Sequence, residues 1–210
     1  MAVKRRRTSL EPAVRRRELL DVATSIFAKK GYRRASISDI IAAANIARGT
    51  FYLYFKSKDE IFLAILDDFQ TRLTAMLDDE GAFGAAGARD GRALLRDDIH
   101  RWLQFFERHR DATTILLKEA TSIDARFEPA LAALRRVALD HLAKRFRSMQ
   151  QHGLVRTSLS PELVSHLQLG MFDQLLNALV LRPGWRVKLD VLADQLADFA
   201  WNGVRSAAVE

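Results

Sequence analysis

The 210-residue sequence predicts an all-α protein of about nine helices in two domains. Apolar residues recur at spacings of three and four along most of the chain, with no strand-like alternation and no internal repeat. Positive charge is concentrated at the start: residues 1–58 hold 14 Lys and Arg against four Asp and Glu, a net of +10, whereas the whole chain carries +7. A basic N-terminal domain followed by a larger helical domain is therefore expected, and its partner should be a polyanion.

The first segment, residues 1–12, begins M-A-V-K-R-R-R and continues with T-S-L-E-P. A secretory signal would place an apolar run after these charges, so export is not expected. We predict a disordered basic arm, which could reach a minor groove or contact phosphates.

The segment Ser36–Lys58 predicts two short helices joined by a tight turn. Ser36 and Asp39 have the spacing of a capping box, and Ile37 and Ile40 then lie on one helical face. Asn45 interrupts the pattern, and Asn tolerates the left-handed backbone that a sharp turn requires. This arrangement is typical of a helix-turn-helix motif.

The second of these helices, predicted over residues 48–55, has the pattern of a recognition helix. Phe51 and Phe55 lie four apart and should point inward, which leaves the other side chains outward with Arg48 at the leading end. The N-terminal residues of such a helix meet base edges in the major groove. The motif as a whole spans about residues 36–55, within a DNA-binding domain predicted over residues 13–58.

The candidate DNA contacts lie on these helices or beside them. Gly49 would allow close approach of the backbone, and Tyr52 offers a hydroxyl to phosphate, although Tyr52 and Tyr54 could instead cover the small core. Lys58 opens the next helix, where amide groups also attract phosphate. The full set is Arg15, Arg16, Ser36, Ser38, Ala47, Arg48, Gly49, Thr50, Tyr52, Leu53, Tyr54 and Lys58.

Residues 15–66 resemble the DNA-binding domain of TetR-type (tetracycline-repressor-like) transcriptional regulators. The matching pieces are R-R-R-E-L-L-D-V-A-T-S-I-F-A-K-K-G-Y, S-I-S-D-I-I-A-A-A and G-T-F-Y-L-Y-F-K-S-K-D-E. The resemblance covers about the first third of the chain. Two positions depart from the family pattern, Asn45 in place of Gly and Ala47 in place of Ser or Thr, and Ala47 cannot cap the recognition helix.

The resemblance implies a sequence-specific regulator, a homodimeric repressor released from a palindromic operator in double-stranded DNA by a small-molecule effector. Residues 59–210 would then form a helical domain for effector binding and dimerisation. An alternative on the same fold is an architectural or cell-division protein that binds DNA without a ligand. An enzyme is not expected, because no catalytic or phosphate-binding motif is present.

Helices continue through the rest of the chain. Ser160 followed by Pro161 marks one start, and Gly153 marks one end. The predicted helices cover about residues 59–79, 92–108, 111–121, 128–152, 161–181 and 187–207, with a glycine-rich loop over residues 81–91.

The last two helices predict the dimer interface. The helix over residues 161–181 is apolar on more than one side, so one side can pack on its own subunit and another needs a partner. The alternative is a large monomeric core. The predicted interface residues are Leu163, Leu167, Met171, Gln174, Leu175, Leu192, Leu196 and Phe199.

An effector site is predicted among residues of the central helices, most of them aromatic. The same residues are equally compatible with an ordinary core. Its candidates are Phe62, Trp102, Phe105, Phe106, Phe146, His166, Phe172 and Asn177. Neither a metal nor a cofactor is expected, since the five histidines lack ligand spacing. The chain has no cysteine and no apolar run of about 20 residues, so a cytoplasmic, nucleoid-associated location without membrane contact is expected.

Overall fold

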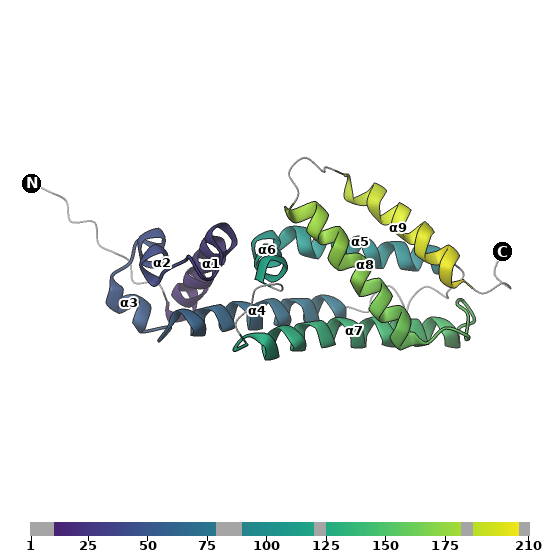
Figure 1. Ribbon diagram of the computed structural model, residues 1–210, viewed down its shortest axis with the longest axis horizontal. Coiled ribbons are helices and arrows are strands. Elements are labelled where there is room, and N and C mark those ends of the chain that lie inside the picture. The colour runs from purple at the N-terminus through teal and green to yellow at the C-terminus, as the bar shows by residue number, and fades with distance from the viewer. Residues whose placement is uncertain (1–10, 79–89, 120–124, 182–186, 206–210) are drawn as a thin grey trace, which may run out of the picture.

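The computed structural model describes residues 11–78, 90–119, 125–181 and 187–205. Nine α-helices and one isolated β-bridge, between Val155 and Arg205, form the regular structure of these residues, so the all-α prediction is confirmed (Figure 1). The predicted basic arm and glycine-rich loop lie almost wholly outside the described residues. The helices are α1 (Pro12–Lys30), α2 (Ile37–Ala44), α3 (Arg48–Tyr52), α4 (Lys58–Asp78), α5 (Gly91–Arg108), α6 (Arg110–Glu119), α7 (Glu128–Gln151), α8 (Pro161–Leu181) and α9 (Leu189–Val204).

The helices α1, α2 and α3 pack together at one end of the molecule, which we call the reading head (Figure 1). Its core consists of large side chains that are at most 1% exposed: Leu19, Phe27, Ile40, Phe51 and Phe55. Because Phe51 and Phe55 face this core as predicted, the opposite side of α3 faces outward.

The long helix α4 connects the reading head to the rest of the chain (Figure 1). Apolar residues along one side of α4 are buried over its whole length, from Ile61 and Phe62 beside the head to Leu73 and Leu77 in the larger domain. The helix packs against α1 near its start and against α7 further on. Its single apolar stripe therefore belongs to both cores, and a displacement of α4 in one domain reaches the other.

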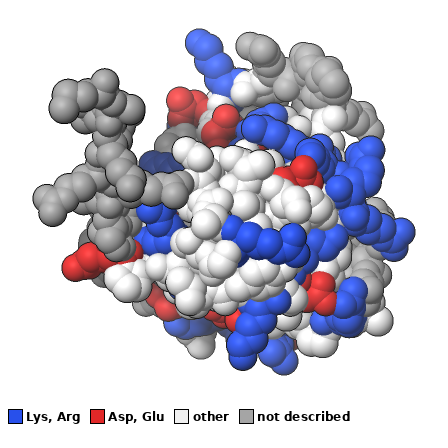
Figure 2. All heavy atoms as spheres, turned by 90° about the vertical axis from the view of Figure 1, so that its left-hand side faces the viewer, with Lys and Arg blue, Asp and Glu red and all other residues white. Residues whose placement is uncertain are grey.

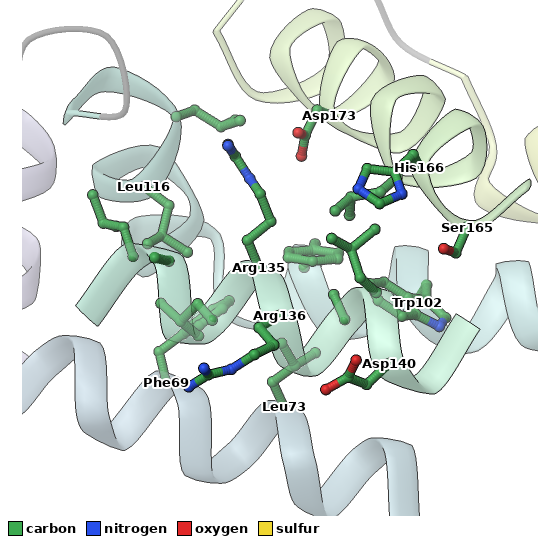
Figure 3. Close-up of a pocket in the computed structure, with 18 of the residues that line it drawn as sticks. Phe69, Leu73, Trp102, Leu116, Arg135, Arg136, Asp140, Ser165, His166 and Asp173 are labelled. Atoms are coloured by element: carbon green, nitrogen blue, oxygen red, sulfur yellow. The ribbon is translucent and has the colours of Figure 1, made fainter. Parts of the chain in front are cut away.

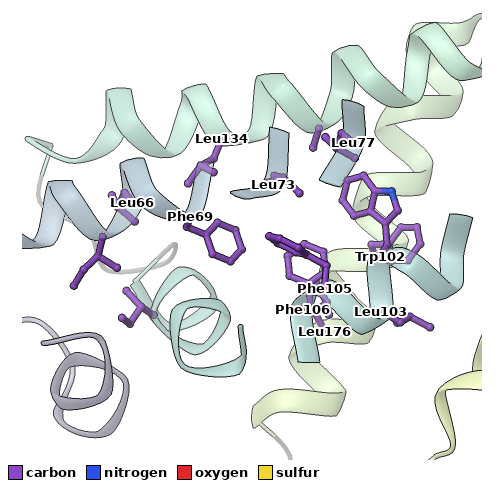
Figure 4. Packing of buried hydrophobic residues seen from close by; sticks show 14 of the residues in the cluster. Leu66, Phe69, Leu73, Leu77, Trp102, Leu103, Phe105, Phe106, Leu134 and Leu176 are labelled. Carbon is purple, nitrogen blue, oxygen red and sulfur yellow. The ribbon is translucent and has the colours of Figure 1, made fainter. Parts of the chain in front are cut away.

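The larger domain is formed by α4 to α9, with α5 packed on α9 and α7 packed on α8. Figure 4 shows its aromatic centre, where Phe69 of α4 lies near Phe105 and Phe106 of α5. The helices α5 and α9 approach closely where Trp201 covers Gly91. A Cβ atom at Gly91 would lie 2.4 Å from the Trp201 ring, so a larger residue would push the two helices apart.

A cluster of three aromatic rings, which we call the junction, joins the larger domain to the head. The ring centroids of Tyr32 and Phe62 lie 4.7 Å apart, and that of Phe127 lies 4.7 Å from Phe62 and 5.0 Å from Tyr32. Phe127 immediately precedes α7 and is only 1% exposed. Beside the rings, the Asp59 carboxylate accepts hydrogen bonds from the Tyr32 hydroxyl and the Arg126 guanidinium.

The junction predicts a large stability difference between two neighbouring substitutions. We expect Phe127→Ala to lower the free energy of unfolding by about 3–5 kcal/mol, because it leaves a cavity among buried rings. Arg126→Ala should cost about 1 kcal/mol or less, since its side chain is more than half exposed. Urea unfolding followed by circular dichroism measures both values. Equal, small effects would show that Phe127 does not stabilise the contact between the domains.

Candidate nucleic-acid interface and internal cavity

The turn between α2 and α3 is fixed by local hydrogen bonds. The Asp39 amide donates to the Ser36 hydroxyl oxygen at 3.1 Å, and the Ser36 amide donates to the Asp39 carboxylate at 2.9 Å, so the predicted capping box is confirmed. A hydrogen bond from Lys30, followed by those from Ser36, lowers the pKa of Asp39 to about 2. Asn45 has a φ of 51°, in the left-handed region, as its place in the turn predicts.

The helix α3 is shorter than predicted, because it ends at Tyr52 instead of residue 55. The Tyr54 amide donates to the Phe51 carbonyl in a tighter turn, which reverses the chain toward α4 while Phe55 stays in the core. No side chain caps the start of α3: the Thr50 amide bonds the Ala47 carbonyl instead. The methyl side chain of Ala47 cannot accept a hydrogen bond, so it does not cap the helix.

The outward side of α3 presents a varied set of groups. Tyr52 is 41% exposed and Leu53 is 81% exposed, the largest exposed fraction of any large apolar residue in the described chain. The Arg48 guanidinium lies 5.7 Å from the centre of the Tyr52 ring, which holds it at the leading end of the helix. Such groups suit base edges: a guanidinium can bind guanine, and an apolar side chain can contact the thymine methyl group.

Basic side chains surround this surface, as Figure 2 shows for the end of the molecule that carries the reading head. Arg16 is exposed and lies over the Phe55 ring, whereas Arg15 is half-buried and paired with Glu18. Of the other predicted contacts, Ser36, Ser38, Ala47 and Gly49 are exposed, and Thr50 and Tyr54 are half-buried. The structure thus gathers the predicted DNA contacts on one end of the molecule; their individual contacts with DNA stay predictions.

Lys58 has a role that the sequence did not indicate. Its ammonium group donates to the main-chain oxygens of Tyr32 at 2.9 Å and Ala35 at 3.0 Å, and it lies 4.3 Å from the centre of the Tyr32 ring. Two of its three N–H groups therefore hold the turn between α1 and α2, and at most one is left for phosphate. The predicted phosphate contact is thus secondary to a structural role that depends on residues more than 20 positions away.

A cavity of about 530 Å³ lies in the larger domain between α7 and α8, and residues of α4, α5 and α6 also line it (Figure 3). Its floor is apolar and includes Phe69, Leu73 and Leu134. Four of the predicted effector residues line it, namely Trp102, Phe106, His166 and Asn177.

The other four predicted effector residues do not line this cavity. Phe62 belongs to the junction, and Phe105 packs edge-on against Phe69 and beside His109. Phe172 stacks behind Trp102, and Phe146 lies with it at a second hollow of only about 30 Å³. Their helical spacing was compatible with either place, because spacing identifies a buried face without saying what fills the space beside it.

Two charged residues of the cavity, Arg135 and Asp173, stand outside the predicted effector set. Arg135 from α7 and Asp173 from α8 extend into the space between the two helices (Figure 3). Burial raises the pKa of the Asp173 carboxyl, and the charge of Arg135 offsets this only in part. Within the described chain, neither side chain has a hydrogen-bonded or ion-paired partner. Both lie in strongly helical segments, where a charged residue normally indicates a solvated face.

A family model described as "Bacterial regulatory proteins, tetR family" matches residues 19–65, which contain the turn and the outward side of α3. The match covers the reading head and the start of α4. It is 27% identical to the HTH-type transcriptional repressor KstR2 of Rhodococcus jostii (strain RHA1), over 91% of the chain and 92% of that repressor.

Two solved structures resemble this chain over most of its length. A TetR-like transcriptional regulator from Rhodococcus sp. RHA1 is 26% identical with a TM-score of 0.71, and the match covers 93% of this chain and 98% of that one. FadR from Bacillus subtilis, solved in complex with stearoyl-CoA, is 20% identical with a TM-score of 0.75 over 90% of this chain and 99% of that one. The chain is a DNA-binding transcriptional regulator and not an enzyme, as predicted.

Large apolar side chains are exposed on α8 and α9 of the larger domain. Leu163 is 55% exposed, Leu167 64% and Phe199 75%, and Gln174 is also exposed. Met171 and Leu175 are half-buried against the core.

Two predicted interface residues face elsewhere. Leu192 and Leu196 are at most 9% exposed, because they lie on the side of α9 that packs on α5 of the same chain. Helical spacing groups them with Phe199, but Phe199 lies at the margin of the buried side of α9 and is 75% exposed. Among the described helices, none is long and apolar enough to cross a membrane.

Gly49 predicts a separation between folding and DNA binding. A Cβ atom at Gly49 would meet no atom within 4 Å, so Gly49→Ala should leave the fold intact and stabilise α3 by up to about 1 kcal/mol. If DNA approaches this backbone closely, operator affinity should fall about tenfold, or about 1.4 kcal/mol. Fluorescence anisotropy measures the affinity, with Gly203→Ala on α9 as a control of equal steric freedom. Unchanged binding by Gly49→Ala would exclude close approach.

Proposed function

We propose that the chain is a homodimeric repressor that binds a palindromic operator and leaves it when a small molecule occupies the cavity between α7 and α8. The observation that carries this proposal is that helices which line the cavity are also connected to the reading head. Glu128 and Leu131 of α7 line the cavity, and Phe127, the residue before them, is part of the junction with Tyr32 and Phe62.

A second connection supports the same mechanism. Leu116 and Leu117 of α6 line the cavity, and the next residue, Lys118, donates a hydrogen bond of 2.9 Å to the Ala28 carbonyl of α1. A ligand that moves α6 or α7 would therefore change how the head is held. It would release DNA only to the extent that it binds the non-DNA-binding arrangement more tightly.

The exposed apolar surface of α8 and α9 supports a dimer. Leu163 and Leu167 of α8 and Phe199 of α9 are each more than half exposed, which is costly for large apolar side chains that are left in water. Pairing this surface with its copy about a two-fold axis would place two reading heads side by side. Heads about 34 Å apart would match successive major grooves of a palindrome.

Known relatives support repression and ligand control for this chain. KstR2 of Rhodococcus jostii is a transcriptional repressor, and the structure of FadR from Bacillus subtilis contains stearoyl-CoA. An open cavity of about 530 Å³ has the size of a small-molecule site, which favours a ligand-controlled regulator over a DNA-binding protein without a ligand. Gel-shift with the DNA upstream of its own gene, repeated with a panel of metabolites, tests the proposal. Occupancy of many unrelated genomic sites, unaffected by any metabolite, would favour an architectural role.

Arg48 should carry sequence specificity. We expect Arg48→Ala to weaken operator binding by about 1–3 kcal/mol while affinity for random DNA changes little, because the exposed guanidinium would lose its contact with a base. Arg16→Ala is the matched control: a phosphate contact should weaken both DNAs alike and lower the salt dependence by about one ion. Affinities measured between low and moderate salt separate the two cases. Equal losses on both DNAs for Arg48→Ala would exclude base reading.

The dimer interface predicts a change of mass. We expect the 23.8 kDa chain to sediment as a dimer and Leu167→Glu to sediment as a monomer with weaker operator binding, since the substitution places paired carboxylates in an apolar interface. Leu63→Glu on α4 is the control, because Leu63 is 40% exposed outside the α8 and α9 surface. A monomeric wild-type protein at micromolar concentration, or a dimeric Leu167→Glu protein, would contradict the interface.

A further inference from the structure

The charges that line the cavity do not favour a strongly anionic ligand. Four carboxylates face it, those of Glu128, Asp140, Glu162 and Asp173, against the guanidinium groups of Arg135 and Arg136. Glu162 is neutralised by Arg147 outside the cavity, at 2.7 Å. The remaining lining still carries more negative than positive charge, so it offers no excess of cations to a phosphate or carboxylate.

The two inward-facing charged groups constrain the ligand further. Asp173 on α8 can only accept hydrogen bonds when ionised, and Arg135 on α7 can only donate them. They face the same space from opposite helices, and neither makes a hydrogen bond or ion pair within the described chain (Figure 3). An anion beside Arg135 would be repelled by Asp173, and a cation beside Asp173 would be repelled by Arg135. A hydroxyl group can donate to one and accept from the other.

We propose that the cavity binds an uncharged molecule with an apolar body and a hydroxyl-type head group, which bridges Asp173 and Arg135. The apolar body would lie against Phe69, Trp102 and Phe106 on the floor. This inference names the ligand class of the proposed effector site and rests on that site being occupied in function. It also differs from the highly charged ligand in the FadR structure, despite the shared fold.

The effect of Asp173 on the stability of the ligand-free protein supports its role as a ligand contact. Because burial raises the pKa of Asp173, its ionised form is less favourable in the folded chain than in water. The protonated Asp173 carboxyl therefore contributes stability to the folded chain below the ordinary pKa of an aspartate. This contribution is lost as the pH rises through the raised pKa of Asp173. The folded protein therefore disfavours the ionised form of Asp173, which is typical of a residue kept for binding. Asp173→Asn should raise the melting temperature of the ligand-free protein at pH 7.

Three probes of equal chain length test the ligand class: decan-1-ol, decanoate and decylammonium, each below its solubility limit. Binding to the full-length chain is measured by isothermal titration calorimetry at pH 7. We expect decan-1-ol to bind at least tenfold more tightly than either charged probe. Tightest binding by decanoate or by decylammonium would overturn the inference, as would no detectable binding of any probe.

Two charge-removing variants show whether Asp173 and Arg135 set this preference. In Asp173→Asn the affinity for decanoate should rise at least tenfold, and in Arg135→Gln the affinity for decylammonium should rise by a similar factor. A merely structural role would lower all three affinities together. Asp198→Asn is the matched control, because Asp198 lies on α9 outside the cavity lining and is paired with Arg92, and it should leave the ranking unchanged.

A parallel gel-shift separates this inference from the proposed function. If decan-1-ol binds as expected but operator DNA stays bound at saturation, the ligand class is supported and the proposed release mechanism is contradicted for this ligand. If a charged probe binds best and releases DNA, the release mechanism is supported and the inferred ligand class is wrong.

Discussion

The insertion of Phe127 beside Tyr32 and Phe62 is the contact on which the relation between the two domains depends. Three large rings lie within about 5 Å of one another at the point where α4 leaves the head and α7 begins. Close-packed interiors do not deform gradually, so such a cluster tends to change between discrete arrangements. A modest displacement at the start of α7 can therefore become a different orientation of the reading head.

Features set by neighbouring residues could be predicted from the sequence. The Ser36 and Asp39 capping box, the left-handed Asn45 and the inward-facing Phe51 each depend on contacts within about four positions. The limits of the predicted helices were correct to within three residues, and the largest differences lie at the ends of α3 and α9. The charge concentration in residues 1–58 likewise needed only a count, and it indicated the correct partner.

Features that depend on distant residues were not predictable. The Lys58 ammonium group donates hydrogen bonds to carbonyls 23 and 26 positions away. Leu192 is buried on the side of α9 that packs on α5 of the same chain. A helical pattern shows that a face is apolar but not whether its own chain or a second copy covers it. The same ambiguity explains why four of the six Phe and Trp effector candidates pack outside the cavity, while Arg135 and Asp173 stood outside the predicted set.

The arrangement also explains how weak coupling could suffice for control. Each head offers few groups that can read bases, chiefly around Arg48 and Leu53, so one head alone should bind a half-site weakly. In a dimer the second half-site is reached at high effective concentration, and this gain depends on the spacing of the two heads. A ligand need not alter the reading surface at all. Moving each head through α6 and α7 would remove the gain from simultaneous binding while every base-reading residue stays in place.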